Sequence, residues 1–255
     1  MKNLETYIIE KILISKTTFI YNYHPKTKDE LKELVDKLIK ERGNDADLND
    51  IDTSKITNMS ELFYNSKFNG DISNWDVSNV ENMAYMFYGS LFNGDISNWD
   101  VSNVESMAYM FTYSKFTDKN GDISNWNVSK VENMEYMFFY VNFNGNISNW
   151  DVSNVTNMLG MFSYSKFTSE NGDISKWDVS NVENMGYMFK NSDFNGNISE
   201  WDVSNVTNMV GMFSNSKFTG ENGDISKWDI SNVTNMKNIF KDSPLEENPP
   251  KWYTK

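Results

Sequence analysis

Apolar side chains recur in a fixed order along most of the chain. In one copy, Trp75, Val77, Val80, Met83 and Phe87 follow one another at the intervals that their counterparts keep elsewhere. Successive copies begin 24 or 27 residues apart. The marker residues are Ile51, Trp75, Trp99, Trp126, Trp150, Trp177, Trp201, Trp228 and Trp252. A period of this length indicates one supersecondary unit stacked on copies of itself.

The apolar spacing within one copy predicts a short strand followed by a short helix. Trp75 and Val77 alternate with polar residues, which favours a strand with both side chains pointing inward. After Val80 the spacing becomes helical, because the apolar positions fall within a sector of about 120° at 100° per residue. This buried stripe consists of Val80, Met83, Met86 and Phe87.

Capping signals and a methionine row complete the predicted coil. Ser78 and Glu81 form a capping box at the start of this helix, and Ser129/Glu132 and Ser180/Glu183 repeat it. The methionines are predicted to form a core row rather than a cofactor site, because methionine fills gaps and every copy is in register. They are Met59, Met83, Met107, Met134, Met158, Met185, Met209 and Met236. The predicted fold class is therefore an α/β repeat solenoid of about eight coils.

Residues before and after the repeats are predicted to close the two ends of the solenoid. Residues 2–14 show helical spacing, and residues 17–23 favour a short strand or an extended connector. Thr27 and Glu30 form a capping box for a second helix, for which Gly43 is the expected C-cap. We expect an N-terminal capping region at 1–47, the repeats at 48–243, and a C-terminal cap at 244–255, where Pro244 interrupts the pattern.

Every second coil contains three additional residues in a loop. The additional residues lie in 117–120, 168–171 and 219–222, so the duplicated unit is 51 residues long, at 70–120, 121–171 and 172–222. Neighbouring strands lie about 4.8 Å apart, so the longer loops should recur about every 10 Å along one edge.

Composition and charge exclude several classes of function. The chain has no cysteine and one histidine, His24, so cysteine- or histidine-based metal sites are not expected, and we expect no cofactor. The chain has no run of about 18 apolar residues, so we expect no membrane insertion. The first residues do not read as a signal peptide, so we expect a cytoplasmic protein, with a surface location only if a leader was removed. The net charge of −13 disfavours direct nucleic-acid binding.

The repeat resembles a known family. The stretch from Phe68 to Met83, Phe-Asn-Gly-Asp-Ile-Ser-Asn-Trp-Asp-Val-Ser-Asn-Val-Glu-Asn-Met, resembles the BspA-like, leucine-rich-repeat-type surface-protein repeats that also occur in mycoplasma lipoproteins. The resemblance covers about residues 51–240. It implies a right-handed, leucine-rich-repeat-like β/α solenoid. The family is associated with surface display, adhesion and protein binding, so the resemblance also implies a protein partner.

An acidic row follows the tryptophans, and two interpretations of it stay open. The row could bind cations or a basic partner, or each carboxylate could accept N–H bonds of its own turn. Asn127 replaces aspartate in one copy without compensation, which favours the local interpretation. A second row after glycine contains Asn146 and Asn197, which disfavours calcium. The first row comprises Asp52, Asp76, Asp100, Asp151, Asp178, Asp202 and Asp229.

Positions that differ between copies are the candidate recognition surface, because stacking explains the invariant ones. At 140° from the buried stripe of the predicted helix, the tyrosines should point outward, where they would either bind a partner or stack on one another. Gly160 and Gly211 occupy the same position in two copies. The candidate partner-binding residues are Tyr85, Tyr109, Tyr136, Tyr187, Glu135, Leu159 and Val210.

Two functions follow, and neither is catalytic. The first is a protein–protein interaction module that uses the variable helix faces and the alternate long loops. The alternative is an acidic mimic of nucleic acid that inhibits a nucleic-acid-binding protein, for example a phage-borne anti-defence factor. The three 51-residue units carry net charges of −5, −3 and −4, whereas duplex DNA carries about −6 over 10 Å. An enzyme is not expected, because an active site needs distinct residues in one pocket and these copies are nearly interchangeable.

Overall fold

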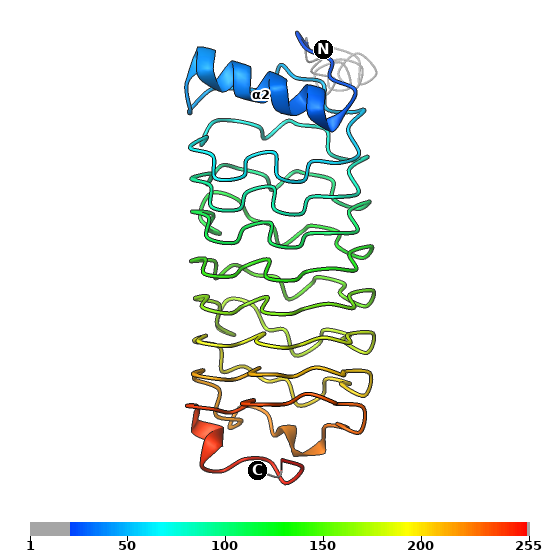
Figure 1. Ribbon diagram of the computed structural model, residues 1–255, viewed down its shortest axis with the longest axis vertical. Helices are drawn as coiled ribbons and strands as arrows, with labels where there is room; N and C mark the ends of the chain where they lie inside the picture. The colour runs from blue at the N-terminus through cyan, green and yellow to red at the C-terminus, as the bar shows by residue number, and fades with distance from the viewer. Residues whose placement is uncertain (1–20, 254–255) are drawn as a thin grey trace, which may run out of the picture.

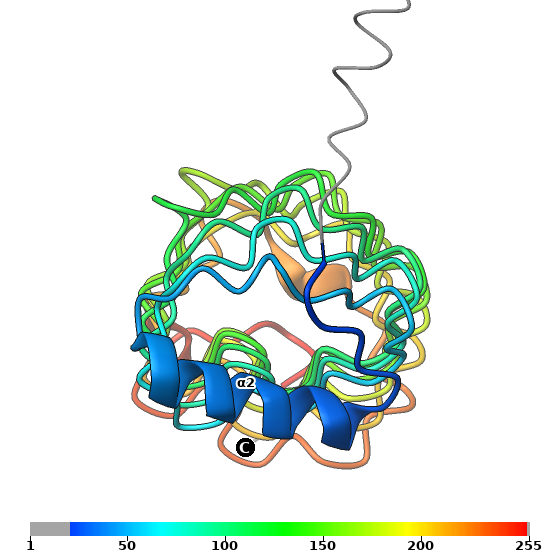
Figure 2. The same cartoon turned by 90° about the horizontal axis from the view of Figure 1, so that it is seen from above.

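A computed structural model describes residues 21–253 as a straight rod of stacked coils (Figure 1). The chain winds once per repeat, and the two ends of the described chain lie at opposite ends of the rod. Seen along the rod, the coils nearly superpose (Figure 2). The predicted helix at 2–14 and the first part of the predicted strand at 17–23 lie outside the described residues.

One end of the rod is covered by helix α2, which spans Lys28–Arg42 (Figures 1 and 2). The helix predicted after Thr27 is confirmed: the Thr27 hydroxyl accepts the Glu30 N–H at 3.2 Å, and the Gly43 N–H donates to the Ile39 carbonyl at 2.9 Å. The Glu30 carboxylate accepts the Lys26 N–H instead of completing the box at Thr27. The buried residues of α2, which join the core of the rod, are Leu31, Val35 and Leu38.

The predicted α/β fold class is wrong. In residues 21–253, α2 is the only α-helix, and the other helical elements are the 3-10 turns η1 (Ile225–Lys227) and η2 (Pro244–Glu246). No continuous strand forms among these residues, and neighbouring coils are linked by isolated parallel bridges. One line of bridges follows the rod through Asn58, Asn82, Ser106, Asn133, Asn157, Asn184, Asn208 and Asn235. The repeat is therefore neither strand-and-helix nor leucine-rich-repeat-like in its secondary structure.

The segment predicted as a helix is a chain of tight turns whose backbone N–H groups donate alternately within and between coils. The N–H groups of Met86, Tyr88 and Ser90 donate to the carbonyl three residues earlier, each at 3.1 Å. The N–H groups between them donate to carbonyls of the next coil, at 2.8–2.9 Å, and these donors are Met83, Tyr85, Phe87 and Gly89. Each coil is thus bonded to its neighbour along the whole segment.

The close spacing of the coils explains why no helix forms. Parallel backbones joined by hydrogen bonds lie about 4.8 Å apart, whereas an α-helix with its side chains is about 10–12 Å wide. Helices in successive coils of a straight rod would therefore collide. The predicted capping boxes are wrong for the same reason: the Ser78 hydroxyl bonds Asp76, and the Glu81 N–H donates to Thr57 of the preceding coil.

The core consists of apolar columns that run the length of the rod. Phenylalanines from Phe63 to Phe240 stack coil on coil, with ring centroids 5.5–5.9 Å apart. The predicted methionine row is confirmed as core: seven of its members are buried and Met236, in the last coil, is half-buried. Each tryptophan also donates its indole N–H to the preceding coil, from Trp75 to the Leu48 carbonyl at 2.9 Å through Trp252 to the Ile225 carbonyl at 2.8 Å.

The indole bond predicts a position-dependent loss of stability. Replacing Trp150 by Phe removes the N–H that donates to the Ile123 carbonyl at 3.0 Å and leaves a small void in the core. We expect the free energy of unfolding, measured by urea titration, to fall by about 2 kcal/mol. The matched variant Trp252→Phe loses the same kind of bond in a half-buried site at the end of the rod, and should cost about half as much. Equal losses at both sites would contradict the inter-coil role of the indole.

Candidate functional site

The turn segments form one face of the rod, called here the turn face, which comprises residues 84–91 and their counterparts in the other coils. Each segment contains two residues in the left-handed region, such as Tyr85 (φ 58°) and Gly89 (φ 62°). Every non-glycine residue with positive φ among residues 21–253 occupies one of these positions. Type II turns require positive φ at their third residue, which is why the positions recur.

Tyrosine is an unexpected occupant of these positions. A left-handed conformation costs a residue with a Cβ roughly 1–2 kcal/mol, while glycine and asparagine adopt it readily. Other coils use Gly160, Gly211, Asn191 and Asn215 there. Strained residues persist where function requires them, so the tyrosines mark a candidate site. The left-handed tyrosines are Tyr85, Tyr109, Tyr113, Tyr136, Tyr140, Tyr164 and Tyr187.

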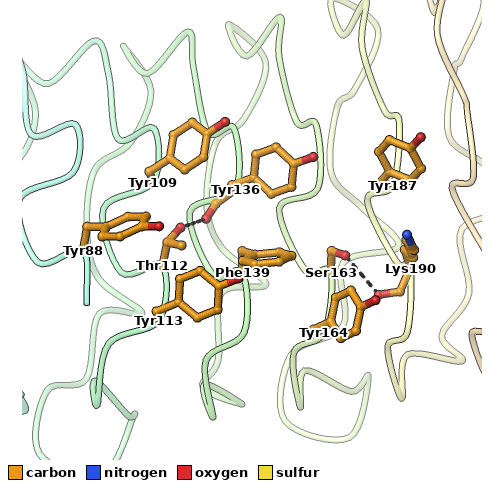
Figure 3. A pocket seen from close by; sticks show the side chains of 10 residues that line it. All are labelled: Tyr88, Tyr109, Thr112, Tyr113, Tyr136, Phe139, Ser163, Tyr164, Tyr187 and Lys190. Carbon is orange, nitrogen blue, oxygen red and sulfur yellow. Dashed lines mark hydrogen bonds between the residues drawn. The ribbon is translucent and has the colours of Figure 1, made fainter. Parts of the chain in front are cut away.

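Three parallel columns of side chains cross the turn face (Figure 3). The first tyrosine column consists of Tyr85, Tyr109, Tyr136 and Tyr187. The middle column consists of Tyr64, Tyr88, Thr112, Phe139, Ser163, Lys190, Ser214 and Lys241. The second tyrosine column consists of Tyr113, Tyr140 and Tyr164.

A groove of about 540 Å³, called here the aromatic groove, lies between the two tyrosine columns (Figure 3). Its floor is the middle column from Tyr88 to Lys190. Aromatic and small residues alternate there, and the small ones, Thr112 and Ser163, are each only 1% exposed because their neighbours cover them. The rings of Tyr88 and Phe139 are therefore the surface that a ligand would meet.

Rings of the floor and of the second tyrosine column stand at right angles. Tyr88 meets Tyr113 at 5.8 Å and 78°, and Phe139 meets Tyr164 at 5.6 Å and 72°. Tyr113 also meets Phe139, at 5.1 Å and 90°. The groove thus contains two equivalent aromatic corners, Tyr88/Tyr113 and Phe139/Tyr164, whose members are 51 residues apart.

The first tyrosine column forms the opposite wall. Tyr85 stacks on Tyr109 at 4.5 Å, and Tyr109 lies 5.1 Å from Tyr136, so three successive rings form a ladder. The ladder ends at Gly160, where a Cβ would lie 2.1 Å from the Tyr136 ring, so this ring can settle only on a glycine. The wall is therefore open between Tyr136 and Tyr187.

A carboxylate fixes the centre of this wall. The Tyr109 hydroxyl donates to Glu135 at 2.7 Å, and the Asn157 side chain donates to the other carboxylate oxygen at 3.2 Å. Burial raises the pKa of Tyr109, and the hydrogen bond to the negatively charged Glu135 raises it further. Burial also raises the pKa of Tyr85 and Tyr136. These tyrosines stay neutral over the physiological range.

One end of the groove is positively charged. The Lys190 ammonium lies 5.1 Å from the Tyr187 ring centroid and 6.0 Å from that of Tyr164. Among the described residues, Lys190 makes no ion pair, whereas Lys166 and Lys217 both pair with Asp193, at 3.1 and 2.7 Å. Lys190 is therefore the cation that the groove can offer to a ligand.

The groove includes only part of the predicted partner-binding set. Tyr109, Tyr136 and Tyr187 line it, Tyr85 extends its wall, and Glu135 orients Tyr109. Leu159 and Val210 lie instead beside Gly186, outside the groove. The prediction that the tyrosines lie on the outer face of a helix is wrong, because they lie on turns.

Most of the groove was not predicted from the sequence. The middle and second tyrosine columns were not identified because they come directly after Phe87 and its counterparts, where the predicted buried stripe ends. Their signal was present in the alternation of Tyr113, Tyr140 and Tyr164 with Gly89, Asn191 and Asn215 at one repeat position, which indicates a left-handed turn. The missed lining residues are Tyr88, Thr112, Tyr113, Phe139, Ser163, Tyr164 and Lys190.

The carboxylates of the acidic row accept hydrogen bonds within their own turns, as one of the two interpretations of the row predicts. Asp76 accepts both the N–H and the hydroxyl of Ser78, at 3.0 and 2.6 Å, and each member of the row accepts the N–H of the serine two residues later. Asn127 makes the same bond with Ser129 at 3.2 Å. Among residues 21–253, no three His, Cys, Asp or Glu side chains gather as a metal site would require.

Charge is segregated between the two parts of each coil. The turn segments from 60–67 to 237–243 carry seven basic and four acidic side chains. The intervening stretches from 44–59 to 218–236 carry five basic and twenty-three acidic ones. An acidic protein therefore presents its groove on a face with a small positive net charge.

The architecture is that of a repeat protein built from stacked 24- and 27-residue coils. Its sequence matches the family described as "Mycoplasma protein of unknown function, DUF285" in three overlapping segments, 30–142, 112–221 and 163–255, and the chain belongs to this family. No curated protein and no solved structure matches it. In the part of the chain that the structure describes, no helix is long and apolar enough to cross a bilayer.

Backbone strain predicts that an exposed tyrosine can be replaced with little loss of stability. Tyr140 is 59% exposed, and the left-handed strain that asparagine relieves offsets the loss of its contacts with the Tyr113 and Tyr164 rings, so Tyr140→Asn should change the free energy of unfolding by less than about 1 kcal/mol. Tyr109→Asn relieves similar strain but loses two ring contacts and the Glu135 bond, and should lower it by about 1–3 kcal/mol. Urea titration of both variants measures the difference, and a clear loss at Tyr140 would contradict the strain argument.

The raised pKa of Tyr109 predicts a loss of stability at high pH. The neutral phenol is favoured in the folded state, so its contribution is complete below the unfolded pKa of about 10 and is lost as the pH rises above it. We expect the free energy of unfolding to fall as the pH rises through about 10 and to keep falling above it, and to fall less in Tyr109→Phe, which has no ionisable phenol at this position. Equal slopes for the two proteins would contradict the assignment.

Proposed function

We propose that this repeat protein is non-catalytic and binds a protein partner through the aromatic groove. The observation that carries the proposal is the placement of seven tyrosines at left-handed positions, where the remaining coils hold glycine and asparagine, with Glu61 in the first coil and Asp242 in the last. Because this arrangement costs backbone energy and lies at the surface, binding explains it better than folding does.

The chemistry of the groove supports a peptide or protein ligand. Aromatic rings with exposed edges and polar tips bury large areas with little loss of side-chain entropy, and they are enriched at protein interfaces. The resemblance to BspA-like and mycoplasma-lipoprotein repeats, which are associated with adhesion and protein binding, points in the same direction.

The segregation of charge supports a second candidate, the acidic mimic of nucleic acid. Most acidic side chains lie on the stretches between the turn segments, where they would face a basic partner. Such binding would weaken steeply with salt, because exposed charges are screened within about 8–10 Å at 0.1–0.15 M ionic strength. Binding in the aromatic groove would respond little to salt, so a salt titration of any partner separates the two candidates.

Removal of one floor ring tests the proposed groove. A random-peptide library is selected on the immobilised wild-type protein, and the enriched peptides are then measured on Phe139→Ser. Serine occupies the same column at Ser163, so the backbone accepts it, and the loss of a central ring should weaken binding at least tenfold.

The matched control is Leu91→Asn, which removes an exposed apolar side chain of the turn face that does not line the groove, and asparagine occupies the same repeat position at Asn142. Its binding should stay within twofold of the wild-type protein, and circular dichroism should show the same fold for all three proteins. Peptides that bind wild-type protein and Phe139→Ser equally well would overturn the assignment of the groove, as would a library that yields no specific binder.

A further inference from the structure

The groove floor repeats every second coil. Tyr88, Phe139 and Lys190 are successive large residues of the middle column, 51 residues apart, with Thr112 and Ser163 covered between them. Coils joined by backbone hydrogen bonds are about 4.8 Å apart, so these three groups recur about every 10 Å along the rod. Two aromatic corners and one ammonium group are thus evenly spaced on a straight line.

This spacing selects one conformation of a bound chain. A polyproline II helix rises about 3.1 Å per residue with three residues per turn, so the same side of the helix recurs about every 9.3 Å. In an extended strand the same side recurs about every 6.8 Å, which fits neither one nor two coils. A polyproline II segment can therefore place residues i, i+3 and i+6 opposite Tyr88, Phe139 and Lys190.

The width of the groove excludes an α-helix. The Phe139 ring on the floor lies 5.3 Å from the Tyr136 ring on one wall and 5.6 Å from the Tyr164 ring on the other, so the centroids of the two wall rings are at most about 11 Å apart. Because the rings themselves take up part of this distance, an α-helix about 10–12 Å across with its side chains does not fit between the walls. A polyproline II chain can, because it has no internal hydrogen bonds and presents flat pyrrolidine rings.

The positive charge of Lys190 favours an acidic residue at the end of the ligand that lies beside it. Its ammonium group is held against Tyr187 and Tyr164 and, among the described residues, has no carboxylate partner. A carboxylate at position i+6 would meet it beside the two rings. The complementary ligand carries proline at i and i+3 and glutamate or aspartate at i+6.

We propose that the aromatic groove recognises an acidic, proline-rich segment of a partner protein in the polyproline II conformation. This inference rests on the proposed function of the groove and specifies its ligand. Prolines pack into the corners Tyr88/Tyr113 and Phe139/Tyr164, and the acidic residue pairs with Lys190. A polyproline II chain presents a similar surface in both chain directions, so the acidic residue can be at either end of the motif.

Defined peptides test the proposal on the whole chain by fluorescence anisotropy. The probe is a fluorescein-labelled peptide of eight prolines with a glutamate at each end, which presents the motif in both directions. One comparison peptide has lysine at each end, and another keeps the glutamates but alternates threonine with serine. The glutamate–proline probe should bind at least tenfold more tightly than either comparison peptide.

Two substitutions connect this preference to the groove. Tyr164→Asn removes one ring of a corner and should weaken the probe at least tenfold, whereas Leu91→Asn, at an exposed position of the turn face that does not line the aromatic groove, should change it less than twofold. Lys190→Glu should reverse the order of the glutamate- and lysine-ended proline peptides. Asparagine suits the left-handed backbone at position 164 and already occupies the counterpart of Leu91 at Asn142, so both variants should fold.

The outcomes separate this inference from the proposed function. Equal binding of the proline and threonine–serine peptides, or a glutamate preference that persists in Lys190→Glu, would overturn the inference. If library peptides depend on Phe139 but lack proline, the groove binds peptides of another kind and only the inference fails. A linear glucan oligosaccharide that binds with the same dependence on Tyr164, while the proline probe does not, would overturn both proposals in favour of a carbohydrate ligand.

Discussion

The separation between successive coils is the constraint on which the structure depends. Backbone N–H groups of the turn segment donate to the next coil at 2.8–2.9 Å, which holds neighbouring chains about 4.8 Å apart. At that distance only flat elements can stack, so the indole rings, phenylalanines and methionines form continuous columns and the rod stays straight. The same distance requires the turns to alternate between local and inter-coil bonds, which places two residues per coil in the left-handed region.

The fixed separation between coils also determines the geometry of the rod's surface. Because each position lies directly over its counterpart, a change of residue in one coil changes one member of a column without moving the backbone. The aromatic groove arises where columns from consecutive coils hold rings instead of glycine, asparagine or serine. Its two-coil period equals the 51-residue period of the sequence, so the duplication that lengthened the chain also repeated the aromatic corner.

The sequence predicts what is buried more reliably than how the backbone is arranged. Trp75, Val77 and the methionine row were predicted to be buried, and all but the terminal Met236 are, because burial depends on which positions are apolar in every copy. Secondary structure was wrong because Met83, Met86 and Phe87 satisfy the spacing of a helix and of a turn chain equally well. A single copy does not contain the distance between coils, which is the quantity that decides between them.

Some residues of the groove were predicted from the sequence and others were not. Tyr109, Tyr136 and Tyr187 were selected because they vary between copies and because the predicted helix placed them outward, and they line the groove although they lie on turns. Tyr113 and Phe139 were missed because they follow the last residue of the predicted buried stripe. Leu159 and Val210 also vary, but they lie beside Gly186, outside the groove.

The left-handed positions also affect how such a protein can evolve. Codons for asparagine, aspartate and tyrosine differ only in their first base, and all three residues occur at these positions, as Asn191, Asp242 and Tyr164 illustrate. A single-base mutation can therefore add or remove an aromatic ring on the rod while the turn keeps its shape. The surface of such a rod can therefore change one coil at a time, through variants that all keep the fold.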